Sequence, residues 1–470
     1  MSDRVPWSKI AAGKSVLLVS ICLVVMTLSW PGALDGRIAS LVWLWIGGAT
    51  GWFMLTWLAW DLRSERTAAG CFKRASVIIV AVAALARVLV SLGGPPVLSD
   101  DIWRYIHDGA TLAEGGNPYA TAPAELDPAQ APLPEVVKLI NNPELVTIYL
   151  PTSQWVFACA AVVYEKLPES WRAGDLLRDR WYRLVFGLFD LGVVIGLLLV
   201  LSRLRLSAWW ACLYAWHPLA LTEVAGSGHQ DPIGVMFLVL VVWFWIGLRQ
   251  RSSWRITDAI GLGGCLALSV LVKPLGVLLV PIIITTLWPR WRAILLSASS
   301  AVVVGCIVGL PFVMMQGGVD RLFETGERFV EVWSFNGSLH TVLMWLLDSK
   351  AQADTLGGAT LLGVVLLLSW RKIDSVRAVM WLGFAGLLTT STSHPWYALW
   401  MLPFCAIRPA ASAWMLSLTL LWAYAAHTQP SYRLPSAVMW IEYLPVYALL
   451  VWDLWRAGRS SDNVSRHADQ

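Results

Sequence analysis

The chain is divided into apolar runs that are long enough to cross, or nearly cross, about 30 Å of hydrocarbon as helices. With 57% hydrophobic and 14% charged residues, it lacks the polar surface that a soluble domain of 470 residues needs. The sequence therefore predicts one all-α, integral-membrane domain over residues 1–470, with about 12–14 transmembrane helices. The runs cover residues 15–30, 38–60, 75–92, 183–202, 207–224, 232–248, 258–272, 275–288, 292–314, 354–370, 378–391, 397–408, 411–427 and 438–456.

Basic clusters between these runs set the expected orientation of the chain. Arg and Lys favour the cytoplasmic side of a membrane, and they gather at 63–74, 203–205, 249–255, 290–292, 371–377 and 456–459. Both termini are then cytoplasmic, and residues 93–182 and 315–353 form two large outer loops. Segment 93–147 fits the outer side, because it carries eight acidic residues against Arg104 and Lys138. The net charge of +4 follows from this topology and indicates no nucleic-acid partner.

Two apolar segments are expected to stay at the outer surface. If residues 148–166 crossed the bilayer, every later basic cluster would lie outside, so this run predicts a helix that lies along or dips into the outer leaflet. Residues 338–347 are too few to cross. A third shallow helix is expected from Asp101, because apolar residues recur there at helical spacing and polar residues share the opposite face. The apolar residues are Ile102, Tyr105, Ile106 and Leu112, and the polar ones are Asp101, Arg104 and Asp108.

The acidic pair Asp100-Asp101 is the strongest candidate for a reactive site. Carboxylates are costly in hydrocarbon, so a pair at the outer exit of a span is expected in an aqueous, functional pocket. Such a carboxylate can act as a general base that takes a proton from a reacting hydroxyl group. The alternative is that both acids only cap the helix that follows and interact with its dipole.

Further polar and aromatic residues map to the same outer side. Asp231 and His229 lie in a glycine-rich turn, for which an ordinary polar turn is the alternative. Lys273 is expected at the tip of a helical hairpin, where it either binds a phosphate or extends to the lipid headgroups. The other candidate substrate-binding residues are Arg104, Tyr105, Asp108, Tyr149, Gln154, Asn336, His340, His394 and Tyr397.

An outward-facing cavity with carboxylates, a cation and aromatic walls suits the transfer of a sugar from a lipid-phosphate carrier. The carrier's tail stays in the bilayer while its headgroup reaches the outer loops. One carboxylate removes the proton of the acceptor hydroxyl, and a cation or metal stabilises the charge on the departing phosphate. If the reaction uses a divalent ion, Asp100, Asp101 and Asp231 offer oxygen ligands suited to Mg²⁺ or Mn²⁺; the sequence leaves metal dependence open.

The sequence resembles the C-type integral-membrane glycosyltransferases (the GT-C fold), within the bacterial group of polyprenyl-phosphate-dependent mannosyltransferase-like proteins. The resemblance spans about 300 residues. It rests on Ser99-Asp100-Asp101-Ile102-Trp103-Arg104-Tyr105-Ile106-His107-Asp108-Gly109, Gly116-Asn117-Pro118-Tyr119, Thr147-Ile148-Tyr149-Leu150-Pro151, Trp216-His217-Pro218-Leu219, Gly226-Ser227-Gly228-His229-Gln230-Asp231 and His394-Pro395-Trp396-Tyr397.

The resemblance implies an inverting transferase with its site on the periplasmic face of the bacterial cytoplasmic membrane. It implies Asp101 as the general base, with Asp100 as the alternative, and Asp231 as a second acid of the site or a metal ligand. The donor would be a polyprenyl-phosphate-linked sugar, with mannose or another hexose favoured. The acceptor would be a glycolipid, a polysaccharide or a protein. Leu150 and His217 depart from residues common in relatives, which affects the expected sugar and acceptor more than the chemistry.

Two other classes of function remain open at this point. A transporter or flippase of lipid-linked saccharides would line a pathway with ionisable residues inside its spans. Only a few such residues, including Arg87, Asp190 and His217, fall within apolar runs here. A non-catalytic scaffold of an envelope-assembly complex would leave the outer acids replaceable.

Overall fold

The computed structural model describes residues 69–127, 132–173, 177–250, 253–428 and 432–468. The predicted spans at 15–30 and 38–60, the expected cytoplasmic N-terminus, Arg63 and Arg66 lie outside these residues. Within the described part, the elements are helices and turns, with two isolated β-bridges that join Phe335 and Asn336 to Thr392. The all-α expectation is therefore confirmed.

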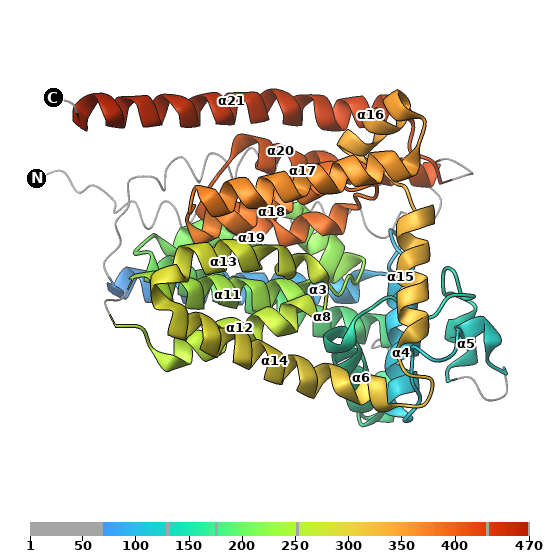
Figure 1. Ribbon diagram of the computed structural model, residues 1–470. Helices are drawn as coiled ribbons and strands as arrows, with labels where there is room; N and C mark the ends of the chain where they lie inside the picture. The colour runs from blue at the N-terminus through green and yellow to red at the C-terminus, as the bar shows by residue number, and fades with distance from the viewer. Residues whose placement is uncertain (1–68, 128–131, 174–176, 251–252, 429–431, 469–470) are drawn as a thin grey trace, which may run out of the picture.

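Six helical segments of the described chain are long and apolar enough to cross a membrane. They run in roughly the same direction across Figure 1 and form a bundle. The segment Pro274–Met314 contains two helices joined at Trp288–Arg290, which Figure 1 draws on separate levels of the bundle. The helices concerned are α3 (Ala69–Gly93), α8 (Arg178–Arg203), α11 (Pro232–Gln250), α13 (Val280–Leu287), α14 (Trp291–Met314), α17 (Lys350–Trp370) and α21 (Ser436–Ala468).

Other predicted spans are shorter or broken. Two of them, α12 (Ile256–Val270) and α18 (Ser375–Thr389), have 15 residues each. The helix α16 (Ser338–Leu347), which the sequence predicts to be too short to cross, has 10 residues. The runs at 207–224, 397–408 and 411–427, expected as continuous spans, are instead chains of short helices. Prolines interrupt two of them, and most of their side chains are buried by neighbouring helices. The short helices are η2 (Ala208–Ala211), α9 (Cys212–Ala215), α10 (Pro218–Ala220), η3 (Leu221–Gly226), η6 (Pro395–Trp400), α19 (Leu402–Ile407), α20 (Ala411–Thr419) and η7 (Leu420–Thr428).

The loop predicted as the first outer loop folds onto one end of the bundle. Its helix α4 (Asp101–Ala113) crosses the direction of the long helices in Figure 1 and packs on α6 (Pro151–Glu165). Helix α4 ends before Gly115, whose φ of 88° few other residues adopt. At 15 residues, α6 is shorter than the roughly 20 that a spanning helix needs. Three short helices complete the loop: η1 (Pro123–Glu125), α5 (Pro134–Val137) and α7 (Glu169–Arg172).

The prediction that the polar face of α4 is open to water is wrong. Arg104 and Asp108 were placed on a face open to water, but their exposed fractions are only 6% and 2%. The loop at 141–145 accepts hydrogen bonds from Arg104, and α6 provides the partner of Asp108. The helix is therefore buried on both faces, because the rest of the loop folds back over its polar side.

The loop predicted as the second outer loop contains α15 (Asp320–Val332), which Figure 1 draws at the same end of the bundle as α4. Asn117 connects the two loops, since its Nδ2 donates to the carbonyl oxygen of Gly318 at 2.7 Å and to that of Gln316 at 3.2 Å. Arg321 adds a bidentate ion pair to Glu125, with N···O distances of 2.6 and 2.7 Å. This pair lowers the pKa of Glu125 to about 2, chiefly through the hydrogen bonds from Arg321.

Candidate active site

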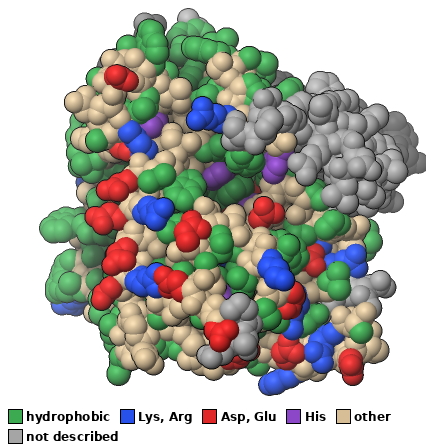
Figure 2. All heavy atoms as spheres, turned by 90° about the vertical axis from the view of Figure 1, so that its right-hand side faces the viewer, with side chains coloured by type: hydrophobic (Ala, Val, Ile, Leu, Met, Phe, Trp, Pro, Cys, Tyr) green, Lys and Arg blue, Asp and Glu red, His purple; other side chains and the backbone are tan. Residues whose placement is uncertain are grey.

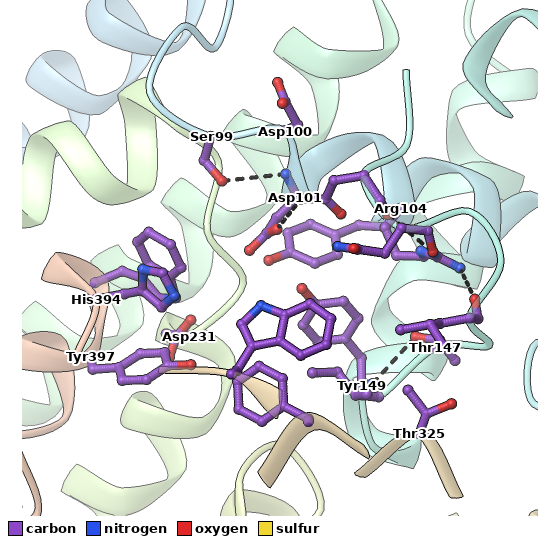
Figure 3. Close-up of a pocket in the computed structure, with 18 of the residues that line it drawn as sticks. Ser99, Asp100, Asp101, Arg104, Thr147, Tyr149, Asp231, Thr325, His394 and Tyr397 are labelled. Carbon is purple, nitrogen blue, oxygen red and sulfur yellow. Dashed lines mark hydrogen bonds between the residues drawn. The ribbon is translucent and has the colours of Figure 1, made fainter. Parts of the chain in front are cut away.

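The end of the bundle that carries α4 and α15 contains a cavity of about 430 Å³. Figure 2 shows this face hollowed near its centre, with histidine side chains beside the hollow. Segments from across the chain contribute to its wall (Figure 3). The predicted residues that line it are Asp100, Asp101, Arg104, Tyr105, Tyr149, Asp231, Lys273, His394 and Tyr397.

Asp101, the first residue of α4, points into this cavity in Figure 3. Its side chain is 21% exposed, its Oδ1 accepts a hydrogen bond of 3.2 Å from Asn141, and its Oδ2 lies 3.8 Å from Nδ1 of His229. Burial raises the pKa of Asp101 above that of a free aspartate, and the Asp231 carboxylate adds to the rise, while Asn141 and Lys273 oppose it. A carboxylate with a raised pKa is a stronger proton acceptor, as a general base requires.

Asp100 has a different environment from its neighbour. It is exposed at the N-cap position of α4 and makes no capping hydrogen bond there through its side chain. In Figure 3 its carboxylate points away from Asp231 and Tyr397. Although Asp100 lines the rim of the cavity, the geometry favours Asp101 as the reactive group of the pair.

Asp231 and Lys273 form an ion pair in the wall of the cavity. Nζ of Lys273 lies 2.6 Å from Oδ1 of Asp231 and 3.8 Å from the ring centre of Tyr397. The same Oδ1 accepts a hydrogen bond of 2.7 Å from the indole of Trp400. Asp231 is almost fully buried, whereas Lys273 is 29% exposed, so the ammonium group faces the space where an anion could bind.

A stack of aromatic rings forms another part of the site. Trp396 lies between His229 and His394, at centroid distances of 3.8 and 4.2 Å. Phe335 continues the stack beyond His394, at 4.8 Å. Burial lowers the pKa of His394 to about 3 and lowers that of His229 well below its usual value, with Lys273 adding to both shifts. Both imidazoles are therefore neutral at pH 7.

Helix α15 provides a wall that sequence reasoning missed. Thr325 and Phe329 of this helix and Trp333, which follows its last residue, line the cavity, and the rings of Phe329 and Trp333 stack at 5.5 Å. The signal was present, because apolar residues recur along residues 320–332 at helical spacing. Asn141 and Tyr432 were also missed, since they lie in irregular segments without a recognisable pattern.

Other predicted substrate-binding residues lie outside the lining of the cavity. Gln154 donates a 3.1 Å hydrogen bond to Asp108 within the packing of α4 on α6. Asn336 donates to Glu442 of α21 at 2.9 Å. His340 of α16 pairs with Asp354 at 3.0 Å. His229 stands behind the wall, in contact with Asp101 but not with the open space.

The described residues contain no complete metal site built from three or more protein ligands. In that part of the chain, no group of three or more His, Cys, Asp or Glu side chains is close enough to hold an ion. Of the predicted ligands, Asp100 points away from the other two, and Oδ1 of Asp231 is already occupied by Lys273 and Trp400. Lys273, by contrast, is a cation that the structure places at this cavity.

Comparison with known families decides what kind of protein carries this cavity. The family model described as alpha-(1->6)-mannopyranosyltransferase, N-terminal domain, matches residues 10–290, more than half of the chain. The protein belongs to this mannosyltransferase family. The resemblance to GT-C membrane glycosyltransferases is thereby confirmed. Comparison with curated proteins gives no match. Membership of the family means that the chain has a sugar donor and an acceptor as substrates.

Proposed function

We propose that this protein transfers a mannosyl group from a polyprenyl-phosphate carrier to an acceptor hydroxyl, with inversion at the anomeric carbon and Asp101 as general base. The observation that carries the proposal is that Asp101 and Lys273, 172 positions apart in sequence, line the same cavity at one end of an apolar bundle. A base and a phosphate-binding cation are the two groups that such a transfer needs.

Asp101 and Lys273 have different roles in the proposed reaction. The acceptor oxygen attacks the anomeric carbon as Asp101 takes its proton, and the bond to the carrier phosphate breaks. Lys273 stabilises the negative charge that collects on the departing phosphate. A covalent intermediate would need a second carboxylate as nucleophile, and Asp231 is already engaged by Lys273 and Trp400. A single direct displacement with Asp101 as base, which inverts the configuration, is therefore favoured.

The distribution of basic residues supports an outer, periplasmic placement of the cavity. Arg203 contacts Asp258, Arg249 donates to the carbonyl of Ile373, and Arg290 donates to that of Leu248. These contacts link basic clusters that lie at helix ends and are predicted to be cytoplasmic. The clusters are far in sequence from the acidic loop that carries Asp101. By the positive-inside rule, the end of the bundle that carries these basic clusters faces the cytoplasm of the bacterial inner membrane, and the cavity faces the outer side.

A transporter or flippase of lipid-linked saccharides is the other candidate, but no contact favours it. Arg87 forms a buried ion pair with Asp190 at 2.6 Å, and Tyr214 also donates to Asp190. His217 is fully buried and accepts from the amide of Leu219. These groups are paired with one another or with the backbone and are closed to solvent, whereas a transport pathway needs them to contact water or substrate.

The test is mannose release from a synthetic polyprenyl-phosphate-mannose donor by the purified protein. Asp101→Asn should lower the turnover rate by about 10² to 10⁴, because the amide cannot accept the proton. Asp100→Asn, which changes the exposed neighbour in the same way, is the matched control and should keep most of the activity. Wild-type protein that moves the donor between vesicle leaflets without releasing sugar would support the transporter instead. The same assay with polyprenyl-phosphate-linked glucose and arabinose measures which sugar the protein prefers.

A further inference from the structure

His229 lies between two carboxyl groups in the interior of the protein. Its Nδ1 is 3.8 Å from Oδ2 of Asp101, and its Nε2 is 3.4 Å from Oε2 of Glu223. His229 and Glu223 are fully buried, and neither ring nitrogen of His229 has a hydrogen-bond partner among the described residues. A buried polar group without a partner is costly, so the two carboxyl groups are its natural partners.

The local backbone holds the imidazole in this position. Gly228 has a φ of 80°, and a Cβ there would lie 2.5 Å from Cδ1 of Ile102 on α4, so the turn passes close to the start of that helix. The amide of His229 donates to the carbonyl oxygen of Glu223 at 2.9 Å. Stacking on Trp396 fixes the plane of the ring. The ring therefore has little freedom to turn away from either carboxyl group.

Glu223 has the environment of a neutral carboxylic acid. Tyr424 OH lies 2.8 and 2.7 Å from its two oxygens, and His229 is its other polar neighbour. No Lys or Arg of the described chain forms an ion pair with it. A fully buried carboxylate without a cation is strongly disfavoured, so the group keeps its proton and can donate it in a hydrogen bond.

We propose that Glu223 and His229 are positioning residues for Asp101. The carboxylic acid of Glu223 donates to Nε2 of His229, which places the imidazole proton on Nδ1, and Nδ1–H donates to Oδ2 of Asp101. Asn141 holds Oδ1 of the same carboxylate, so both oxygens are fixed in position at the cavity wall. The 3.8 Å contact shortens when substrate binds, as catalytic hydrogen bonds often do. This inference rests on the proposed function, because it assigns the relay to the general base.

The charged and titratable groups around His229 come from four segments. Asp101 faces it from α4 and Glu223 from η3, while Lys273 and His394 lower its pKa from the other side. Because Nδ1–H favours the ionised form of Asp101, its loss should raise the pKa of that carboxyl group. The acidic limb of kcat/KM would then move to higher pH.

The kinetic test compares Glu223→Leu with Glu223→Gln. Leucine removes the hydrogen-bond donor, and kcat should fall by up to about 10²-fold with little change in the KM for donor. Glutamine restores an N–H donor of similar size and should recover most of the rate. His229→Phe keeps the stack on Trp396 but lacks both nitrogens, and should resemble Glu223→Leu. His340→Gln is the matched control, because His340 is also buried beside a carboxylate but lies away from the cavity.

A spectroscopic test does not depend on turnover. The ¹⁵N NMR spectrum of histidine-labelled protein should contain one neutral imidazole protonated on Nδ1, which is absent from His229→Phe. In Glu223→Leu the signal of its unprotonated Nε2 should shift, because this nitrogen loses its hydrogen bond. An Nε2–H form in the wild type, or an unchanged kcat and acidic limb in the folded Glu223→Leu protein, would overturn the relay. Absence of mannose release by the wild type would instead reject the proposed function, while the NMR result still decides the relay.

Discussion

Nζ of Lys273 and Oδ1 of Asp231 lie 2.6 Å apart, although 42 positions separate the two residues in sequence. The pair joins the turn before α11 to the segment before η4 and holds one ammonium group at the edge of the cavity. Because Asp231 is nearly fully buried, its charge depends on this partner and on Trp400.

Lys273→Met should lower both donor binding and stability. Removing one partner of a buried ion pair leaves an uncompensated charge, which lowers the free energy of unfolding by up to about 3–5 kcal/mol. The loss should be smaller here because Lys273 is partly exposed. Thermal unfolding in detergent measures the loss. The double variant Lys273→Met/Asp231→Asn should recover much of the stability without recovering the affinity for donor. A double variant as unstable as Lys273→Met alone would contradict this account.

Asn141→Ala should shift the pH dependence of the reaction. The hydrogen bond from Asn141 favours the ionised form of Asp101, so its removal raises a pKa that burial has already raised. A base works only when deprotonated, so activity is lost as the pH falls through this pKa. The acidic limb of kcat/KM should therefore move to higher pH, with little change on the alkaline side. Thr325→Val, in the same cavity but without a contact to Asp101, should leave the limb in place.

Gly109→Ala should separate α4 from α6. A Cβ at Gly109 would lie 2.4 Å from the hydroxyl oxygen of Tyr182 and 2.5 Å from the carbonyl oxygen of Phe157, closer than van der Waals contact permits. We expect a loss of about 1–3 kcal/mol in the free energy of unfolding. Gly358→Ala in α17 is the control, because a Cβ there meets nothing within 4 Å. It should be neutral or stabilising by about 0.5–1 kcal/mol. Equal effects of the two changes would rule out the close contact as the cause.

Asn117→Ala should loosen α15 without unfolding the bundle. The change removes both hydrogen bonds to the segment that leads into α15, so amide hydrogen exchange should accelerate across residues 320–333. The turnover rate should fall, since α15 forms one wall of the cavity. Glu125→Gln breaks the exposed ion pair to Arg321 and should have a smaller effect, about 0–1 kcal/mol, that salt further reduces. Faster exchange throughout the bundle would argue against a local anchor.

The family and the helical, membrane-spanning class could be predicted from sequence because both depend on local properties. Apolar runs report the preference of side chains for hydrocarbon, and the motif around Asp100-Asp101 marks the loop that carries the candidate base. The same signal could not separate spans from buried interior segments. Residues 207–224 are as apolar as a span, yet they fold into short helices covered by protein.

The amino-acid sequence by itself determined that the chain is a membrane protein and that Asp101, Asp231 and Lys273 are the polar groups to examine. Only the tertiary structure decided that Lys273 pairs with Asp231, that α15 closes the cavity, and that Glu223 stands behind His229. Hydropathy and motif spacing describe each side chain and its neighbours along the chain. The partner of a buried charge is set by packing between segments far apart in sequence, so it appears only once the helices are assembled.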